Sequence, residues 1–301
     1  MTKVLFSADL HGNTSQYQKL VSCAIEKGAD SVIIGGDIAP KAFSEEEDYI
    51  QGQREFLENG LVKLLSPLKE QRRDIRVFLM MGNDDCKANM DVLRKHDPSL
   101  FHVIHNKRLK LSGEFEIVGY SIVPITPFRI KDWEKYDLSR VPARFERRYS
   151  AQKSTEYLLK GSRSTRQGWK DYAFKPSAEK RSSIQRDLES ELFTQNPSRT
   201  VYVFHAPPHD TCLDKHNVFI EGFGWVSVSI GSFAVREFIE RHQPYATLHG
   251  HAHMSANITG RYKQRIGETI SISAGNNNTP STLSLIEFHL ENPWMARRHI
   301  I

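Results

Sequence analysis

KVLFSADLHG at residues 3–12 and SVIIGGD at residues 31–37 decide the fold of this chain. Each stretch holds a short apolar run that stops at an aspartate, Asp9 in the first and Asp37 in the second. Between them, residues 14–28 carry apolar side chains at helical spacing and end in glycine. A buried strand, a helix and a second buried strand are typical of a β-α-β unit.

The same alternation continues along the chain. Buried-strand patterns and amphipathic helical patterns follow one another, which favours an α/β fold. The predicted strands are residues 77–84, 115–124, 201–205, 245–253, 270–275 and 283–290, and the predicted helices are residues 46–72, 181–194 and 231–242.

Five of these predicted strands end in a side chain that can bind a metal ion. These side chains are Asp9, Asp37, Asn83, His205 and His251. In open α/β sheets, ligands bind beyond the carboxyl ends of the strands. The pattern therefore predicts that five segments far apart in sequence meet at one site.

The stretch HGHAH at residues 249–253 has three readings when taken alone: metal ligands, a charged surface loop, or hydrogen-bonded core histidines. Carboxylate and amide oxygens together with imidazole nitrogens suit Mn²⁺, Fe, Zn²⁺ or Ni²⁺. The three cysteines, Cys23, Cys86 and Cys212, are odd in number and far apart, which argues against a disulfide framework and a cysteine zinc site.

A set of short motifs, in this order, resembles the signature of the calcineurin-like metallophosphoesterase superfamily. The motifs are D-x-H at 9–11, G-G-D at 35–37, G-N-D-D at 82–85, a lone His205, and G-H-x-H at 250–253. Within that superfamily, HAPPHD at 205–210 and GSFAVREFIE at 231–240 look similar to the Icc-related predicted phosphoesterases. The resemblance runs from Asp9 to His253, most of the chain.

The resemblance implies a four-layer β-sandwich of two mixed sheets flanked by helices. We expect one metallophosphoesterase domain over residues 1–301, with a basic aromatic insert at about 126–180. It also implies two divalent metal ions, with manganese expected and iron, zinc or nickel open. Its implied ligands are Asp9, His11 and His253 for one ion, Asp37 as the bridge, and Asn83, His205 and His251 for the other.

One position departs from the family pattern. Many members have histidine after the G-N pair, where it is thought to protonate the leaving oxygen, and this chain has Asp84. Two nearby cations favour the ionised form of an aspartate, which is then a poor general acid. We therefore expect phosphodiesters to be hydrolysed in preference to monoesters, by a metal-activated water, with Asp37, Asn83 and Asp84 as catalytic residues.

Two further residues are candidates with open alternatives. His209 could face the substrate and substitute as the acid, or be a plain loop histidine. Arg236 could reach the substrate phosphate together with Asn83, or be a surface arginine.

Positive charge is concentrated in residues 126–200, which hold 17 lysines and arginines against 10 acidic residues. Such a segment favours an anionic partner, a nucleotide or nucleic acid, although a solvated basic surface explains it equally well. A nuclease and a non-catalytic metal-bound scaffold therefore stay as alternatives to the phosphoesterase.

The chain has no apolar run near the ~20 residues that span a bilayer, and its start lacks the pattern of a secretion signal. We expect a cytoplasmic protein without membrane partners, and the oligomeric state stays open.

Overall fold

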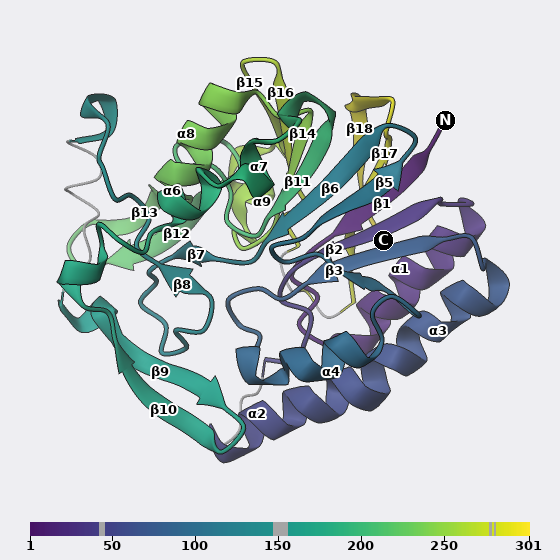
Figure 1. Ribbon diagram of the computed structural model, residues 1–301, viewed down its shortest axis with the longest axis horizontal. Coiled ribbons are helices and arrows are strands. Elements are labelled where there is room, and N and C mark those ends of the chain that lie inside the picture. The colour runs from purple at the N-terminus through teal and green to yellow at the C-terminus, as the bar shows by residue number, and fades with distance from the viewer. Residues whose placement is uncertain (42–45, 147–155, 277–278, 280) are drawn as a thin grey trace.

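The computed structural model describes residues 1–41, 46–146, 156–276, 279 and 281–301. Two six-stranded sheets face each other at the centre of the molecule (Figure 1). The first sheet has the order β18 (Asn292–Ile300), β17 (Ser284–His289), β1 (Lys3–Ser7), β2 (Ser31–Gly35), β3 (Arg76–Met80) and β4 (His102–Val103). The second has the order β15 (Lys263–Ile266), β16 (Thr269–Ser273), β14 (Ala246–His249), β11 (Thr200–Phe204), β6 (Phe115–Tyr120) and β5 (Arg108–Ser112).

Both sheets are mixed, with a parallel centre. Strands β1 to β4 run parallel to one another, as do β6, β11, β14 and β16. The remaining strands add to the edges in antiparallel pairs. The carboxyl ends of the parallel strands therefore lie at one edge of each sheet, where the side chains that follow them can meet.

Helices cover the outer face of each sheet. The first sheet is flanked by α1 (Thr14–Glu26) and α3 (Leu61–Gln71), and the second by α6 (Ile184–Leu188) and α8 (Phe233–His242) (Figure 1). This helix–sheet–sheet–helix order confirms the predicted four-layer sandwich. No helix in the described parts of the chain is long and apolar enough to cross a membrane.

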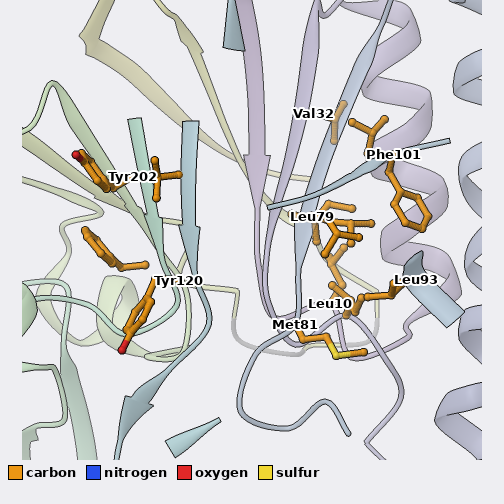
Figure 2. Packing of buried hydrophobic residues seen from close by; sticks show 14 of the residues in the cluster. Leu10, Val32, Leu79, Met81, Leu93, Phe101, Tyr120 and Tyr202 are labelled. Carbon is orange, nitrogen blue, oxygen red and sulfur yellow. The ribbon is translucent and has the colours of Figure 1, made fainter. Parts of the chain in front are cut away.

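Strand alternation divides the core into an inner layer and outer layers. Along β1 and β3, Phe6 and Phe78 point between the sheets, where they pack with Val203 and Leu248 of the second sheet. Leu79, next to Phe78, points the other way and packs under the helices (Figure 2). The strands are buried on both faces, which explains their near-continuous apolar sequences.

Some elements differ from the predictions. The predicted helix at 46–72 is α2 (Glu46–Glu55), one π turn (Phe56–Gly60) and α3. The predicted helix at 181–194 is instead two short helices, α6 and α7 (Glu191–Thr194). The side chain of Ser183 caps the start of α6, and Ser190 precedes the start of α7.

Two hairpins were not predicted. They are β9 (Lys160–Thr165) with β10 (Gly168–Ala173), and β12 (Lys215–Ile220) with β13 (Gly224–Ser229). Each is a separate two-stranded sheet, so neither carries the buried apolar pattern that marks the central strands. Other short elements are α4 (Met90–Lys95), α9 (Ser255–Thr259), β7 (Val123–Pro124) and β8 (Glu134–Lys135), together with several 3-10 turns.

Leu79→Ala should lower the free energy of unfolding by about 2–5 kcal/mol, because it leaves a cavity in a fully buried site under the helices. Denaturant titration followed by circular dichroism measures this change. The control is Met295→Ala on the exposed face of β18, which should stay within about 0.5 kcal/mol of the parent protein. Equal stability of the two variants would contradict the assigned packing.

Candidate metal centre

The side chains predicted from the strand ends do meet at one place. Asp9, Asp37 and Asn83 follow β1, β2 and β3, which are adjacent strands of the first sheet. His205 follows β11 and His251 follows β14, which are adjacent in the second sheet. The site therefore lies where the carboxyl edges of the two sheets come together.

One group of side chains contains Asp9, His11, Asp37 and His253, whose ligand atoms all lie within 4.8 Å of one another. His11 Nε2 is 3.4 Å from His253 Nε2 and 3.8 Å from Asp37 Oδ2. His253 Nε2 is also 3.6 Å from Asp9 Oδ1. Two oxygens and two nitrogens thus converge on a space about the size of one cation.

A second group lies on the other side of Asp37. The Asn83 side-chain oxygen is 3.0 Å from His205 Nε2 and 2.7 Å from His251 Nδ1. His205 Nε2 is 3.3 Å from the same Asp37 oxygen, Oδ2, that faces His11. The Asp37 carboxylate is therefore shared between the two groups.

The backbone at these positions is strained. Asp9, His11, Asp37 and His251 have positive φ angles of 58°, 44°, 52° and 65°. Non-glycine residues adopt this left-handed region uncommonly, and such residues cluster at functional sites. Each turn costs on the order of 1 kcal/mol or more, which the surrounding packing offsets.

Two glycines of the G-G-D and G-N-D-D motifs give these side chains their room. A Cβ on Gly36 would collide with the ring of His205, and Gly36 also has a φ of 107°. A Cβ on Gly82 would collide with the Asp37 carboxylate and lie 2.6 Å from the His205 ring. Both motifs therefore need glycine because a backbone segment passes directly against a candidate ligand.

The buried charges are strongly coupled. Burial by itself would lower the pKa of His205, but the adjacent Asp37 carboxylate outweighs burial and raises this pKa to about 10. Burial and the charge of His205 lower the pKa of His251 to about 3. In the absence of a cation, a proton on His205 thus balances part of the negative charge of Asp37.

The residues of the two groups fit divalent cations in two ways: their donor atoms suit such ions, and some of these buried atoms lack a hydrogen-bond partner. Among the described residues, Asp9 Oδ2 and His11 Nδ1 are buried polar atoms without a hydrogen-bond partner. A buried carboxylate oxygen without a donor is costly unless a cation accepts its charge. The donor set of carboxylate, amide and imidazole, without thiolate, suits manganese, iron, zinc or nickel.

Asp85 holds the loops that carry the ligands, and sequence reasoning missed this role. Its carboxylate accepts hydrogen bonds from the backbone N–H groups of Ile38, Ala39 and Gly82, at 3.0, 2.8 and 2.8 Å. Its own carbonyl accepts a hydrogen bond from the Trp133 indole at 2.7 Å. The second aspartate of G-N-D-D thus joins the loop after β2 to the loop after β3.

Lys41 is a second residue that sequence reasoning missed. Its Nζ lies 2.6 Å from Asp84 Oδ2, and Asn83 Nδ2 donates to Asp84 Oδ1 at 3.0 Å. Burial opposes the charge of Lys41, but Asp84 outweighs it, so the pKa of Lys41 is raised. Asp84 stands where the resemblance led us to look for a histidine, and it is paired with Lys41.

Three other histidine and arginine candidates lie outside these groups. The ring of His209 stacks on Phe233 with centroids 3.7 Å apart, and its Nδ1 is 3.8 Å from Asp214. Arg236 pairs with Glu240 at 2.5 Å. The substrate roles of His209 and Arg236 stay predictions. His249 is buried in β14, and its ring nitrogens are 3.1 Å from the Ala206 carbonyl oxygen and 2.8 Å from the Thr247 hydroxyl.

A pocket of about 740 Å³ opens from the metal centre. Asp37, Asn83, Asp84, His251 and His253 form its inner end. Its other walls come from the segment after β6, the β12–β13 hairpin and the start of α8. Volumes of ~300–1,000 Å³ are typical of sites for small ligands.

Comparison with known proteins places this arrangement in a family. The family model described as "Calcineurin-like phosphoesterase" matches residues 2–255. The chain belongs to this family. No curated protein sequence matches it significantly.

Several solved structures resemble this chain over nearly its whole length. One matches with a TM-score of 0.58 and 15% identity, over 99% of this chain and 98% of that one. The protein TT1561 of Thermus thermophilus matches with a TM-score of 0.53 and 16% identity, over 99% and 98% of the two chains. A dimetal phosphatase from Danio rerio matches with a TM-score of 0.48 and 12% identity, over 95% and 91%. At identities of 15% and 16%, the likeness to the first two structures shows the fold alone.

Gly82→Ala should weaken Mn²⁺ binding by about 10- to 100-fold, because the new methyl group displaces the Asp37 carboxylate. Isothermal titration calorimetry with Mn²⁺ on the metal-stripped protein measures this change. Gly52→Ala in α2 is the matched control, because a Cβ there meets no atom within 4 Å. Unchanged affinity in a correctly folded Gly82→Ala protein would rule out Asp37 as a ligand.

Proposed function

We propose that this protein is a dinuclear metal-dependent phosphoesterase that favours phosphodiesters over monoesters. The observation that carries the proposal is the position of the Asp37 carboxylate, shared between two groups of ligand-type side chains. A bridging carboxylate with terminal ligands on both sides is what a pair of divalent ions requires.

The chain's own residues define where the phosphate would lie. When bound, the two divalent ions would supply an activated water and neutralise charge on the phosphoryl group. Asn83 and His251 line the pocket at its inner end, next to Asp37. A phosphate ester that reaches this end is held by side chains from both sheets, and its two substituents must point along the pocket walls.

The preference for diesters rests on the Asp84–Lys41 pair. Asp84 accepts hydrogen bonds from Lys41 and from Asn83, so both of its oxygens are engaged as acceptors. A carboxylate held in this way is a poor proton donor for a leaving oxygen. Leaving groups that need little protonation should therefore be released more readily than poor ones, while Lys41 adds a positive charge close to the phosphate.

The nuclease alternative has less support from the described residues. Within 126–200, Lys131, Lys135 and Arg144 form ion pairs with Glu134, Asp187 and Glu240. Among the described residues that line the pocket, those from 126–180 include no lysine or arginine. Polynucleotide binding depends on several phosphate contacts by such side chains, so a small ester fits better. Manganese as the native metal and a cytoplasmic location stay predictions.

With Mn²⁺ added, bis(para-nitrophenyl) phosphate should be hydrolysed with a kcat/KM about tenfold or more above that of the monoester phenyl phosphate, because para-nitrophenolate leaves with little protonation and phenolate does not. Stripping the metal, or the change Asp37→Ala, should abolish both activities, because both ion sites lose their shared ligand. Release of para-nitrophenol and of phenol measures the rates. Binding of Mn²⁺ without turnover of either ester would favour the scaffold alternative instead.

Asp84→His should raise monoester hydrolysis relative to diester hydrolysis by about tenfold or more, because an imidazolium can protonate the leaving oxygen. Asp84→Asn is the matched control, since it removes the carboxylate without offering an acid. The ratio of the two kcat/KM values, measured from pH 5 to pH 9 with each variant, tests this. An Asp84→His ratio equal to that of Asp84→Asn would refute the role given to this position.

A further inference from the structure

The walls of the pocket differ in character from its inner end. Beyond the metal centre the lining is mainly apolar, and it comprises Pro124, Ile125, Pro127, Phe128, Leu159, Pro176, Val218, Ile230, Phe233 and Met254. The polar side chains on these walls are Thr126, Tyr136, Asp137, Glu179, His216 and Ser229. One of them, Asp137, is already used, because it accepts hydrogen bonds from the Ser232 hydroxyl and the Phe233 N–H at the start of α8.

The charged side chains among the described residues of the walls do not favour binding of a second anionic group of the substrate. Lys41 is the only lysine or arginine among the described lining residues. It is paired with Asp84 beside the metal centre. Glu179 and Asp137 bring carboxylates to the walls. Among the described lining residues, a substituent with a further phosphate would therefore find no lysine or arginine other than Lys41 to bind it.

The apolar surface continues out of the pocket along the β12–β13 hairpin. His216 and Val218 of β12 line the pocket, and strand alternation places Ile220 on the same face, nearer the tip. Ile220 is 42% exposed on this face and Phe223 is 83% exposed at the turn, while Phe219 and Trp225 are exposed at 64% and 73% on the opposite face of the hairpin. Phe128 and Met254, which line the pocket, are also exposed.

Six of the ten exposed large apolar side chains among the described residues thus belong to the pocket or to this hairpin. Figure 1 shows the hairpin at the side of the molecule, apart from the central sheets. Exposed apolar side chains gathered in one place mark interaction sites, whereas single ones are ordinary. The core does not need these residues, since the hairpin is a separate two-stranded sheet.

We propose that the substrate is an amphiphilic phosphate ester, with its phosphate at the metal centre and an extended apolar substituent, alkyl or aryl, along these walls. This inference rests on the proposed function for its phosphate end. The substituent passes Val218 and Ile230 and leaves the pocket along the Ile220 face of the hairpin. Apolar burial on this path supplies the binding energy that a charged substituent would obtain from lysines and arginines.

The test uses methyl, butyl and octyl para-nitrophenyl phosphate, each below its critical micelle concentration, with the Mn²⁺-loaded protein. We expect kcat/KM to rise about fourfold for each of the first several methylenes, since each one buried is worth about that factor. Equal values for methyl and octyl esters would overturn the inference and leave the phosphodiesterase proposal standing. A higher kcat/KM for the para-nitrophenyl ester of thymidine monophosphate than for the octyl ester would also overturn it.

Val218→Ser should lower kcat/KM for the octyl ester more than for the methyl ester, by about tenfold or more, because it places a hydroxyl on the apolar path. Met295→Ser, an exposed position on β18, is the control and should leave the selectivity unchanged. Loss of the same factor for both esters in Val218→Ser would point to a general structural effect and count against the path.

A binding measurement separates this inference from the proposed function. Octylphosphonate and methylphosphonate are not hydrolysed, and their binding to the Mn²⁺-loaded protein can be measured by calorimetry. If no ester is turned over, the proposed hydrolysis fails, but tighter binding of octylphosphonate by about tenfold or more would still support the apolar path. Equal binding of the two phosphonates would overturn the path regardless of activity.

Discussion

Burial of the Asp37 carboxylate among histidines is the constraint on which the rest of the structure depends. A carboxylate that is 1% exposed costs several kcal/mol unless opposite charge or hydrogen bonds compensate it. Here the compensation comes from His205, whose Nε2 lies 3.3 Å from the carboxylate, and from the Asp84 N–H at 2.8 Å. These groups belong to segments that follow different strands, so the two sheets must face each other with their carboxyl edges aligned.

The strained turns follow from the same constraint. The chain must leave each strand and immediately aim a side chain inward, which puts Asp9, Asp37 and His251 into left-handed backbone conformations. Local strain of this kind persists only where the surroundings over-determine it. Asp85 supplies part of that support, because its carboxylate binds three backbone N–H groups from two loops. Two bound cations would also stabilise these strained turns, since each would join candidate ligands from both sheets.

Much of the fold, and the meeting of the candidate ligands at one place, could be predicted from the sequence, because both depend on strand ends. A buried strand of a parallel sheet is a run of apolar residues, and Asp9 and Asp37 mark the points where two such runs stop. The hairpins could not be predicted, since their pairing is local and half-exposed and follows no core pattern. Lys41 and Asp85 were missed because their roles depend on contacts across loops, which spacing along the chain does not encode.

The basic segment shows why net charge alone was a weak guide to function. Lys131 is fully buried and donates to Glu134 and to the Thr126 carbonyl, which fixes the wall of the pocket. Arg166 reaches Asp91, and Trp169 packs against Tyr49, so the β9–β10 hairpin is tied to α2 and α4. Part of the positive charge therefore anchors the insert against acidic partners elsewhere on the chain. The insert also presents Phe128, Leu159 and Pro176 to the pocket, which supports the proposal that an apolar group of the substrate binds there.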